Sequence, residues 1–145
     1  MGLVYEQALK FKAKYPTTVA WRIKKNAKVI EMHLNPDEKP LYTFDTKKND
    51  SVFDIFSTAV VCLTNKRILI GRKRVVIGYF LDSITPDMFN DLKLKTGIFW
   101  GKIYIDTINE LVVLSNISHP ALAEIETEIS SYMMEIKKLY PSFDK

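Results

Sequence analysis

The sequence predicts an α+β fold that is mainly β: a partly open antiparallel barrel of about seven strands, capped by a C-terminal amphipathic helix and preceded by two N-terminal helices. Apolar residues recur every three or four positions before residue 36 and after residue 118, as in helices. Between residues 40 and 114 the period is two, as in strands. A chain of 145 residues has room for one domain, and so many short antiparallel strands hide their edges best in a partly closed barrel or two packed sheets.

Two helices are expected in the first third of the chain. The first has one apolar stripe, formed by Val4, Ala8, Phe11 and Tyr15. Pro16 ends this helix, and Thr17 or Thr18 can cap the next one. The apolar spacing then continues through Val19, Ile23, Ala27, Ile30 and Leu34. We therefore expect a helical N-terminal extension over residues 1–36, followed by a β-rich domain over residues 37–145.

Seven strands are expected after this extension. They are separated by short polar or glycine-containing turns that suit antiparallel hairpins, such as Asn65-Lys66 and Thr96-Gly97. The alternation is clearest around residues 92–95, where two leucines face a core if the two lysines face water. The expected strands cover residues 40–46, 57–64, 67–72, 75–81, 89–95, 98–106 and 110–114.

A final amphipathic helix is expected after Ser118-His119-Pro120, because Ser118 can cap it and Pro120 suits its first turn. Its apolar face needs an apolar surface to pack against, and the open mouth of the barrel is the nearest one. The positions of that face are Leu122, Ile125, Ile129, Tyr132 or Met133, Ile136 and Leu139.

Two stretches resemble the bacterial pleckstrin-homology (PH-like) domain family. Residues 61–70 contain the apolar–polar–apolar hairpin Leu63-Thr64-Asn65-Lys66-Arg67, and residues 96–107 place an aromatic pair between two glycines, ahead of Ser115-Asn116-Ile117 and the final helix. The resemblance extends over about residues 37–139 and implies a PH-like barrel behind a helical extension. It implies a fold more than a function, since this fold serves lipid binding, peptide binding and scaffolding.

Several classes of function find no support in the sequence. The one cysteine, Cys62, sits in an apolar run, and the histidines His33 and His119 lack closely spaced partners for a metal site. No phosphate-binding glycine loop or nucleophile motif occurs. We expect a non-enzymatic protein with no cofactor and no metal, and a Cys–His pair remains the only enzymatic alternative. The lack of an apolar span and the single cysteine favour a cytoplasmic protein.

Positive charge is concentrated at the N-terminus. Residues 1–35 carry +5, residues 36–115 carry +1 and residues 116–145 carry −2, within a total of +4. A second basic cluster lies at predicted hairpin turns and is formed by Lys66, Arg67, Arg72, Lys73 and Arg74. These cations either contact an anionic ligand, such as the inner membrane face, or form solvated turns. The interspersed acids argue against nucleic acid as a partner.

The aromatic pair Phe99-Trp100 is a candidate interface, because tryptophan beside glycines is either an exposed anchor or a half-buried core residue. Our leading hypothesis is a binding or scaffold module that acts through protein–protein contacts, including homo-oligomer formation. The observation behind this hypothesis is the amphipathic N-terminal arm, which packs either on its own domain or on a neighbouring chain. The alternative function is peripheral binding to anionic membrane lipids through the basic turns and the arm.

Overall fold

The computed structural model describes residues 2–48, 58–74 and 77–138. Three α-helices form within these residues: α1 (Leu3–Lys14), α2 (Ile23–Glu31) and α3 (Ala121–Lys137). A short 3₁₀ helix, η1 (Pro86–Met88), lies in the middle of the chain. The strands are β1 (Pro40–Lys48), β2 (Thr58–Thr64), β3 (Ile68–Lys73), β4 (Tyr79–Ile84), β5 (Phe89–Thr96), β6 (Trp100–Thr107) and β7 (Leu111–Ser118).

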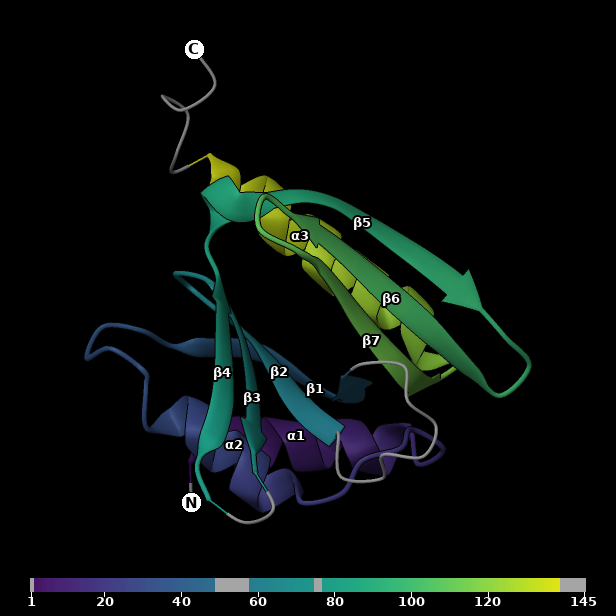
Figure 1. The fold of residues 1–145 in the computed structure, drawn as a ribbon. Coiled ribbons are helices and arrows are strands. Elements are labelled where there is room, and N and C mark those ends of the chain that lie inside the picture. The colour runs from purple at the N-terminus through teal and green to yellow at the C-terminus, as the bar shows by residue number, and fades with distance from the viewer. Residues whose placement is uncertain (1, 49–57, 75–76, 139–145) are drawn as a thin grey trace.

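The strands form one curved antiparallel sheet in the order β4-β3-β2-β1-β7-β6-β5 (Figure 1). β1 joins the two halves, because it pairs with β2 along most of its length and with β7 only at Lys47 and Lys48. The sheet is a half-barrel, and no ladder joins β4 to β5 within the described residues. The predicted α+β, mainly β fold is therefore confirmed, including its partly open barrel and the helices at both ends.

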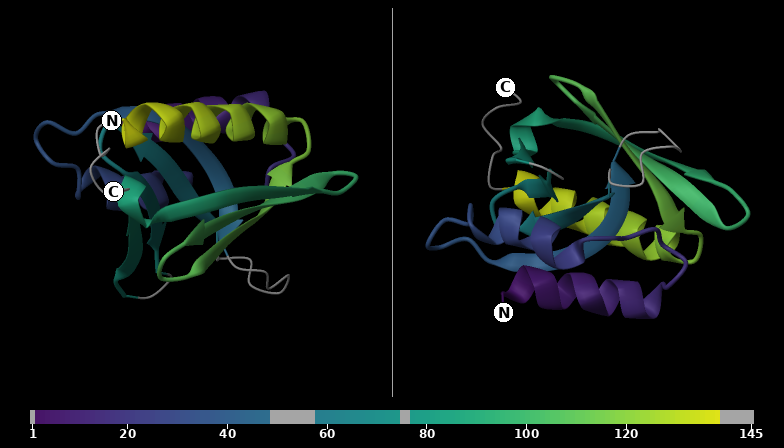
Figure 2. Two further views of the ribbon diagram at one scale, coloured as in Figure 1. Left: turned by 90° about the horizontal axis from the view of Figure 1, so that it is seen from above. Right: turned by 60° about the horizontal axis from the view of Figure 1, so that its bottom comes forward.

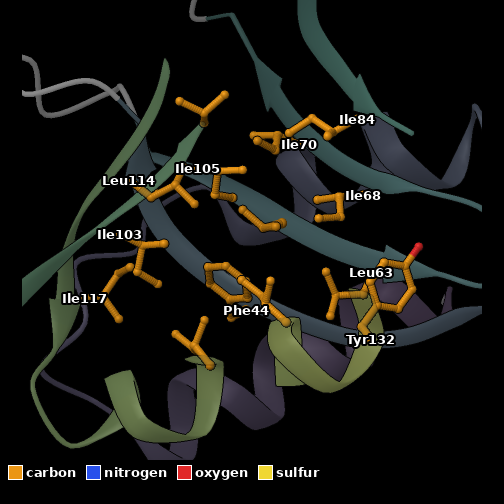
Figure 3. Packing of buried hydrophobic residues seen from close by; sticks show 14 of the residues in the cluster. Phe44, Leu63, Ile68, Ile70, Ile84, Ile103, Ile105, Leu114, Ile117 and Tyr132 are labelled. Atoms are coloured by element: carbon orange, nitrogen blue, oxygen red, sulfur yellow. The ribbon is translucent and has the colours of Figure 1, made fainter. Parts of the chain in front are cut away.

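α3 packs on the concave side of the sheet, where the larger core lies (Figures 2 and 3). Phe44 of β1 is fully buried at its centre, surrounded by side chains of both sheet halves and of the helix. Every predicted apolar position of the helix that the structure describes reaches this core. These residues are Leu122, Ile125, Ile129, Tyr132, Met133 and Ile136. The predicted position Leu139 lies outside the described residues.

The N-terminal helices cover the opposite, convex side of the first four strands, as the right-hand view of Figure 2 shows. Their apolar stripe, which includes Val4, Ala8 and Ile30, packs on Val60 and Cys62 of β2. β2 is consequently buried along its whole length, with alternate residues in the two cores. The apolar side chains of the arm thus pack on the sheet of their own chain.

The predicted helix start at Val19 is wrong, since α2 begins only at Ile23. Val19 instead donates its backbone N–H to the carbonyl of Asn116 at 2.9 Å, and Thr18 accepts a hydrogen bond from the Ser118 N–H. Residues 17–19 therefore lie against the end of β7, and this pairing competes with helix formation. Arg22 turns the chain into α2 with a positive φ of 58°.

Two predicted strand boundaries also need correction. The strand expected at 75–81 begins at Tyr79, because Gly78 adopts a φ of 86° and closes the hairpin by accepting a bond from the Arg74 N–H. The strand expected at 110–114 continues to Ser118, past Asn116 with a φ of 55°. Residues 57 and 75–76, where two of the predicted strands begin, lie outside the described residues.

Candidate functional site

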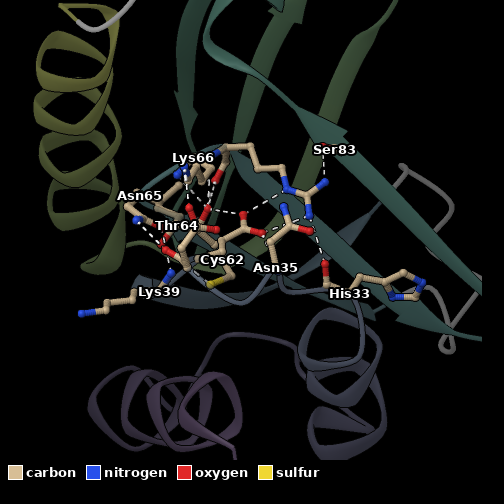
Figure 4. A network of polar contacts seen from close by, with 12 residues as sticks. His33, Asn35, Lys39, Cys62, Thr64, Asn65, Lys66 and Ser83 are labelled. Atoms are coloured by element: carbon tan, nitrogen blue, oxygen red, sulfur yellow. Dashed lines mark hydrogen bonds and ion pairs between the residues drawn. The ribbon is translucent and has the colours of Figure 1, made fainter.

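A network of polar contacts lies at the hairpin turn between β2 and β3 (Figure 4), and the carboxylate of Glu38 accepts several of its hydrogen bonds. The Glu38 side chain is fully buried and accepts hydrogen bonds from Arg67 Nε at 3.0 Å and from the Thr64 hydroxyl at 2.6 Å. Burial acts to raise the pKa of Glu38, but the hydrogen bonds from Arg67, Thr64 and the Asn35 amide outweigh it and hold that pKa below its usual value.

The guanidinium of Arg67 donates most of its hydrogen bonds to groups within the protein. Its guanidinium also reaches the Ser83 hydroxyl and the carbonyl of His33, both at 3.1 Å. Asn65 binds the backbone of Asp37 and Lys39, and Lys66 pairs with Asp37 at 3.0 Å near the surface. The Thr64–Arg67 motif therefore fixes the segment that leads from α2 into β1. This leaves Arg67 with little capacity to contact an anionic ligand as well.

The predicted cluster of Arg72, Lys73 and Arg74 is divided between the two faces of the β3–β4 hairpin. Arg72 shares the concave face with Ile70 and pairs in register with Phe80. The guanidinium carbons of Arg72 and Arg74 lie 4.6 and 5.3 Å from the centroid of the Phe80 ring, within cation–π range. Lys73 alternates with Arg72 and points to the convex face, toward α2.

On that convex face the arm and the hairpin enclose a cavity of about 320 Å³. Three lysines line it, two from α2 and one from β3, together with apolar and aromatic side chains, and no carboxylate is among the lining residues that the structure describes. We call this hollow the basic cleft; its residues are Lys25, Lys28, Val29, Met32, Lys73 and Tyr79. It brings together the two basic segments that the sequence assigned to separate candidate sites.

Hydrogen bonds hold α2 in place beside the hairpin. Asn26 is buried and accepts the Lys73 N–H at 2.8 Å while it donates to the Thr58 carbonyl at 3.0 Å. Arg22 donates to the carbonyls of Lys73 and Arg74 at 2.8 and 3.1 Å. The positions of Lys25 and Lys28 are thus tied to the backbone of the strand that carries Lys73.

Tyr79 closes the other wall of the basic cleft. Its hydroxyl lies 3.0 Å from His33 Nε2, and the two rings are 5.0 Å apart. His33 Nδ1 lies 2.7 Å from the carbonyl oxygen of Val29, one turn earlier. Beyond Tyr79, the hairpin presents Ile77, which is 78% exposed. Cationic, aromatic and apolar groups therefore lie at one end of the molecule.

The second predicted site, Phe99 and Trp100, is at the tip of the β5–β6 hairpin. Phe99 is 67% exposed and Trp100 is 42% exposed. The Trp100 indole donates a hydrogen bond to the Thr17 carbonyl at 2.6 Å, so the segment after α1 orients it. The structure places these aromatics far along the chain and the sheet from the basic cleft, on the opposite edge of the half-barrel (Figure 1).

The profile of the family described as "Bacterial PH domain" matches residues 34–130, which is more than half of the chain. The chain belongs to this family. Both motifs that carried the sequence resemblance lie inside the matched range, and the helices α1 and α2 lie before it. No curated protein matches the sequence. Membership supports a binding module as the coarse function of this PH domain and names no ligand or partner.

Nothing in the described part of this PH domain points to enzymatic activity. Cys62 lies in the apolar cluster beneath α1 and α2, and burial raises the pKa of its thiol to about 11, so the thiol stays protonated at neutral pH. His119 Nδ1 lies against the Gly97 carbonyl at 2.6 Å, and His33 is engaged by Val29 and Tyr79. Within the described ranges no hydrogen bond joins either histidine to Cys62, and no group of acidic, His or Cys side chains could hold a metal ion.

Sequence reasoning did not single out Lys25 and Lys28 as site residues. A signal was present, because positions 25, 28, 29 and 32 share one face of a helix at spacings of three and four. What the sequence could not supply was the strand that this face meets.

The structure also has no helix, in the parts it describes, with the length and apolar character needed to cross a bilayer.

Proposed function

We propose that this PH domain binds anionic lipid surfaces peripherally through the basic cleft and the adjacent tip of the β3–β4 hairpin. The observation that carries the proposal is the convergence of Lys25 and Lys28 with Lys73 around one cavity. Each cation held near an anionic bilayer contributes about 1 kcal/mol, so several together attach a protein where one or two do not. A site on the inner face of the cell membrane fits this chemistry.

Apolar groups beside the cations support the same proposal. Basic residues alone give weak attachment, and burial of an apolar side chain at the lipid boundary strengthens it. Ile77 and Phe80 are exposed at the hairpin, and the guanidinium of Arg72 stacks on Phe80. The hairpin would place aromatic and apolar groups at the acyl boundary while the lysines remain among the headgroups.

The test is co-sedimentation of the full chain with vesicles of phosphatidylcholine alone or mixed with phosphatidylglycerol. We expect binding only to the anionic vesicles, with weaker binding at higher salt. Replacing Lys25, Lys28 and Lys73 by Gln should weaken binding about a hundredfold, from three contributions of about 1 kcal/mol each.

A matched control replaces the exposed Lys10, Lys39 and Lys138 by Gln, which lowers the net charge equally and leaves the basic cleft intact. This control should bind nearly as the unaltered chain does. Equal losses in both triple variants would show attraction by net charge alone, and equal binding to neutral vesicles would refute the proposal. Competition by inorganic phosphate would indicate that the cleft recognises phosphate free of a bilayer.

Protein–protein contact, including self-association, is a second function that we propose for a different surface. The apolar stripe of α1 and α2 is buried on the chain's own sheet, so the arm is not the surface concerned. The observation that favours self-association is the convex side of β5, β6 and β7, whose outward residues remain intermediate or exposed. In the described residues, no helix has a buried face packed there.

A further inference from the structure

The turn of the β5–β6 hairpin carries a cluster of exposed apolar side chains. Ile98 is 87% exposed, and the exposed aromatic residues Phe99 and Trp100 follow it. We call these three residues the apolar tip. Figure 2 shows that the hairpin projects beyond the rest of the fold. Large apolar side chains gathered in water forgo the stabilisation that burial gives, so such a cluster marks a contact site.

Hydrogen bonds hold the backbone of the apolar tip. The Gly97 N–H donates to the Trp100 carbonyl at 2.8 Å, and the Phe99 carbonyl accepts the N–H of His119 at 3.0 Å. His119 Nδ1 also lies 2.6 Å from the Gly97 carbonyl oxygen. These backbone groups do not depend on water for a partner, which lowers the cost of moving the turn into an apolar medium.

The aromatic rings of the tip are held in place as well. The rings of Phe99 and Trp100 meet edge to face, with their centroids 6.1 Å apart. The Trp100 indole N–H donates to the Thr17 carbonyl at 2.6 Å, so this polar atom also has its partner within the chain. A preformed arrangement reduces the conformational entropy that binding would remove.

Positive charge lies behind the apolar tip. Residues 92–105 contain three lysines and no carboxylate. The exposed Lys95 is on the same side of the hairpin as Trp100 and stands three residues before Ile98, about 10 Å at the rise of a strand. Apolar groups of proteins at membrane surfaces reach about 5–10 Å into the boundary between headgroups and acyl chains. Lys95 would therefore lie among anionic headgroups when Ile98 reaches that boundary.

We propose that the apolar tip inserts into the boundary between the headgroups and the acyl chains of an anionic lipid bilayer. Ile98 and Phe99 enter deepest, and Trp100 lies nearer the headgroups, where the amphipathic indole ring is favoured. A projecting turn whose backbone is already bonded can enter a fluid bilayer, whereas a protein partner would need a pocket of matching shape. This inference rests on the proposed lipid binding and adds an apolar contact on a hairpin other than the one beside the basic cleft.

The fluorescence of Trp100 reports insertion directly. The chain contains two tryptophans, so Trp21→Phe leaves Trp100 as the only one. On vesicles of phosphatidylcholine mixed with phosphatidylglycerol, the emission of Trp100 should shift to shorter wavelength. Phosphatidylcholine brominated on its acyl chains should quench this emission. Unshifted and unquenched emission on vesicles that bind the chain would overturn insertion.

Co-sedimentation measures the contribution of the tip to binding. Ile98→Ser with Phe99→Ser removes two apolar side chains and leaves the charge unchanged. Binding to the mixed vesicles should weaken at least about tenfold, because the two side chains no longer leave water on binding. This factor should be the same at low and at high salt, whereas the loss in the triple variant of the basic cleft should shrink as salt rises.

A matched control, Leu41→Ser with Ile108→Ser, removes two exposed apolar side chains that lie away from the tip. It should bind as the unaltered chain does, and circular dichroism checks that each variant is folded. A loss in the control equal to that in the tip variant would overturn insertion.

The two lipid contacts can fail separately. An unaltered chain that binds no vesicles overturns both the basic cleft and insertion of the tip. Full binding by the tip variant, with a loss in the cleft variant, leaves the cleft standing and overturns insertion; a tip that binds a protein instead would give this result. A loss in the tip variant alone supports insertion and overturns the cleft.

Discussion

Asp45 is a buried carboxyl in the middle of β1, on the side that α1 covers. Its side chain has no exposed surface, and neither carboxyl oxygen has a hydrogen-bond partner within the described residues. Burial raises the pKa of Asp45 to about 8, against the opposing charge of Lys12. The carboxyl is therefore mainly protonated at neutral pH, since an ionised form would lack both water and a partner.

This residue gives the protein a pH dependence of a definite sign. The pKa of an aspartate in the unfolded chain is about 3.9, so the folded state holds an extra proton between about pH 4 and pH 8. The free energy of unfolding should fall as pH rises through this window. Asp45→Asn removes the titration, so its stability relative to the unaltered chain should increase by at least about 2 kcal/mol from pH 4 to pH 8.

Thermal unfolding at a series of pH values measures the difference between the two proteins. The difference isolates Asp45 from Glu38 and Glu124, whose lowered pKa values act in the opposite direction in both proteins. The exposed Asp87→Asn serves as the control and should follow the unaltered chain at every pH. Parallel curves for Asp45→Asn and the unaltered chain would contradict the prediction.

The Thr64–Arg67 motif shows that a sequence can predict where a turn lies without predicting what its side chains contact. The Thr64–Arg67 motif was identified from the sequence, and its hairpin position is confirmed. Its chemistry was not evident, because the partner of Arg67 is Glu38, 29 residues earlier in a segment without regular structure. An arginine in a turn gives the same sequence signal whether it faces an internal carboxylate or a ligand.

At the scale of elements, periodicity predicted most of the fold. The period of two located the strands because alternate residues enter one of two cores, and the period near 3.6 located the helices. Periodicity predicted a helix start at Val19 wrongly, because Val19 fits an apolar stripe of helical spacing but its backbone N–H bonds to β7. Such long-range backbone pairing overrides local preference and leaves no local trace in the sequence.

Packing between α2 and β3 depends on the absence of a side chain at Gly71. A Cβ atom there would lie 2.8 Å from Ile30 Cγ1 and 3.1 Å from the Asn26 carbonyl oxygen. Gly71→Ala should therefore push α2 away from the sheet and lower the free energy of unfolding by about 1–3 kcal/mol, the usual cost of overpacking. Urea denaturation measures this loss.

A double-mutant cycle identifies the contact that causes the loss. Ile30→Ala alone opens a cavity in the convex core, and that cavity gives room to the methyl group that Gly71→Ala introduces. The two losses should therefore be less than additive, by about 0.5 kcal/mol or more. Additive losses would show that the strain at Gly71 comes from the backbone of Asn26 and not from Ile30.

At the scale of the whole molecule, both sides of the first sheet half are occupied. α3 packs on the concave core and the N-terminal helices pack on the convex one. Glu124 of α3 connects these layers, since it accepts hydrogen bonds from Tyr42 of β1 at 2.7 Å and from Tyr15, next to α1, at 2.9 Å. The helical extension is thus bonded to the closing helix as well as packed on the sheet.

The basic cleft exists only in this assembled state. Its lysines come from segments 48 positions apart, with Lys25 in the extension and Lys73 in the barrel. The sequence shows that both segments carry positive charge, but it does not show that they lie side by side in the fold. The division of the chain at residues 36 and 37, which the sequence predicts, would separate the two halves of the cleft.

Whether the barrel folds without its extension is a direct test of that division. Removal of residues 1–36 would expose the apolar side chains of Val60, Cys62 and Leu69, which are almost fully buried in the complete chain. Loss of burial costs about 1.5–3 kcal/mol for each Val or Leu side chain, a large part of the stability of a small domain. We therefore expect residues 37–145 to unfold or aggregate when they are produced alone, and heteronuclear NMR spectra to lack dispersed signals.

Addition of a peptide of residues 1–36 should restore dispersion, because Asn26 and Arg22 then regain their bonds to β3. A well-dispersed spectrum of the isolated barrel would instead establish residues 37–145 as an independent domain and the helices as a detachable arm.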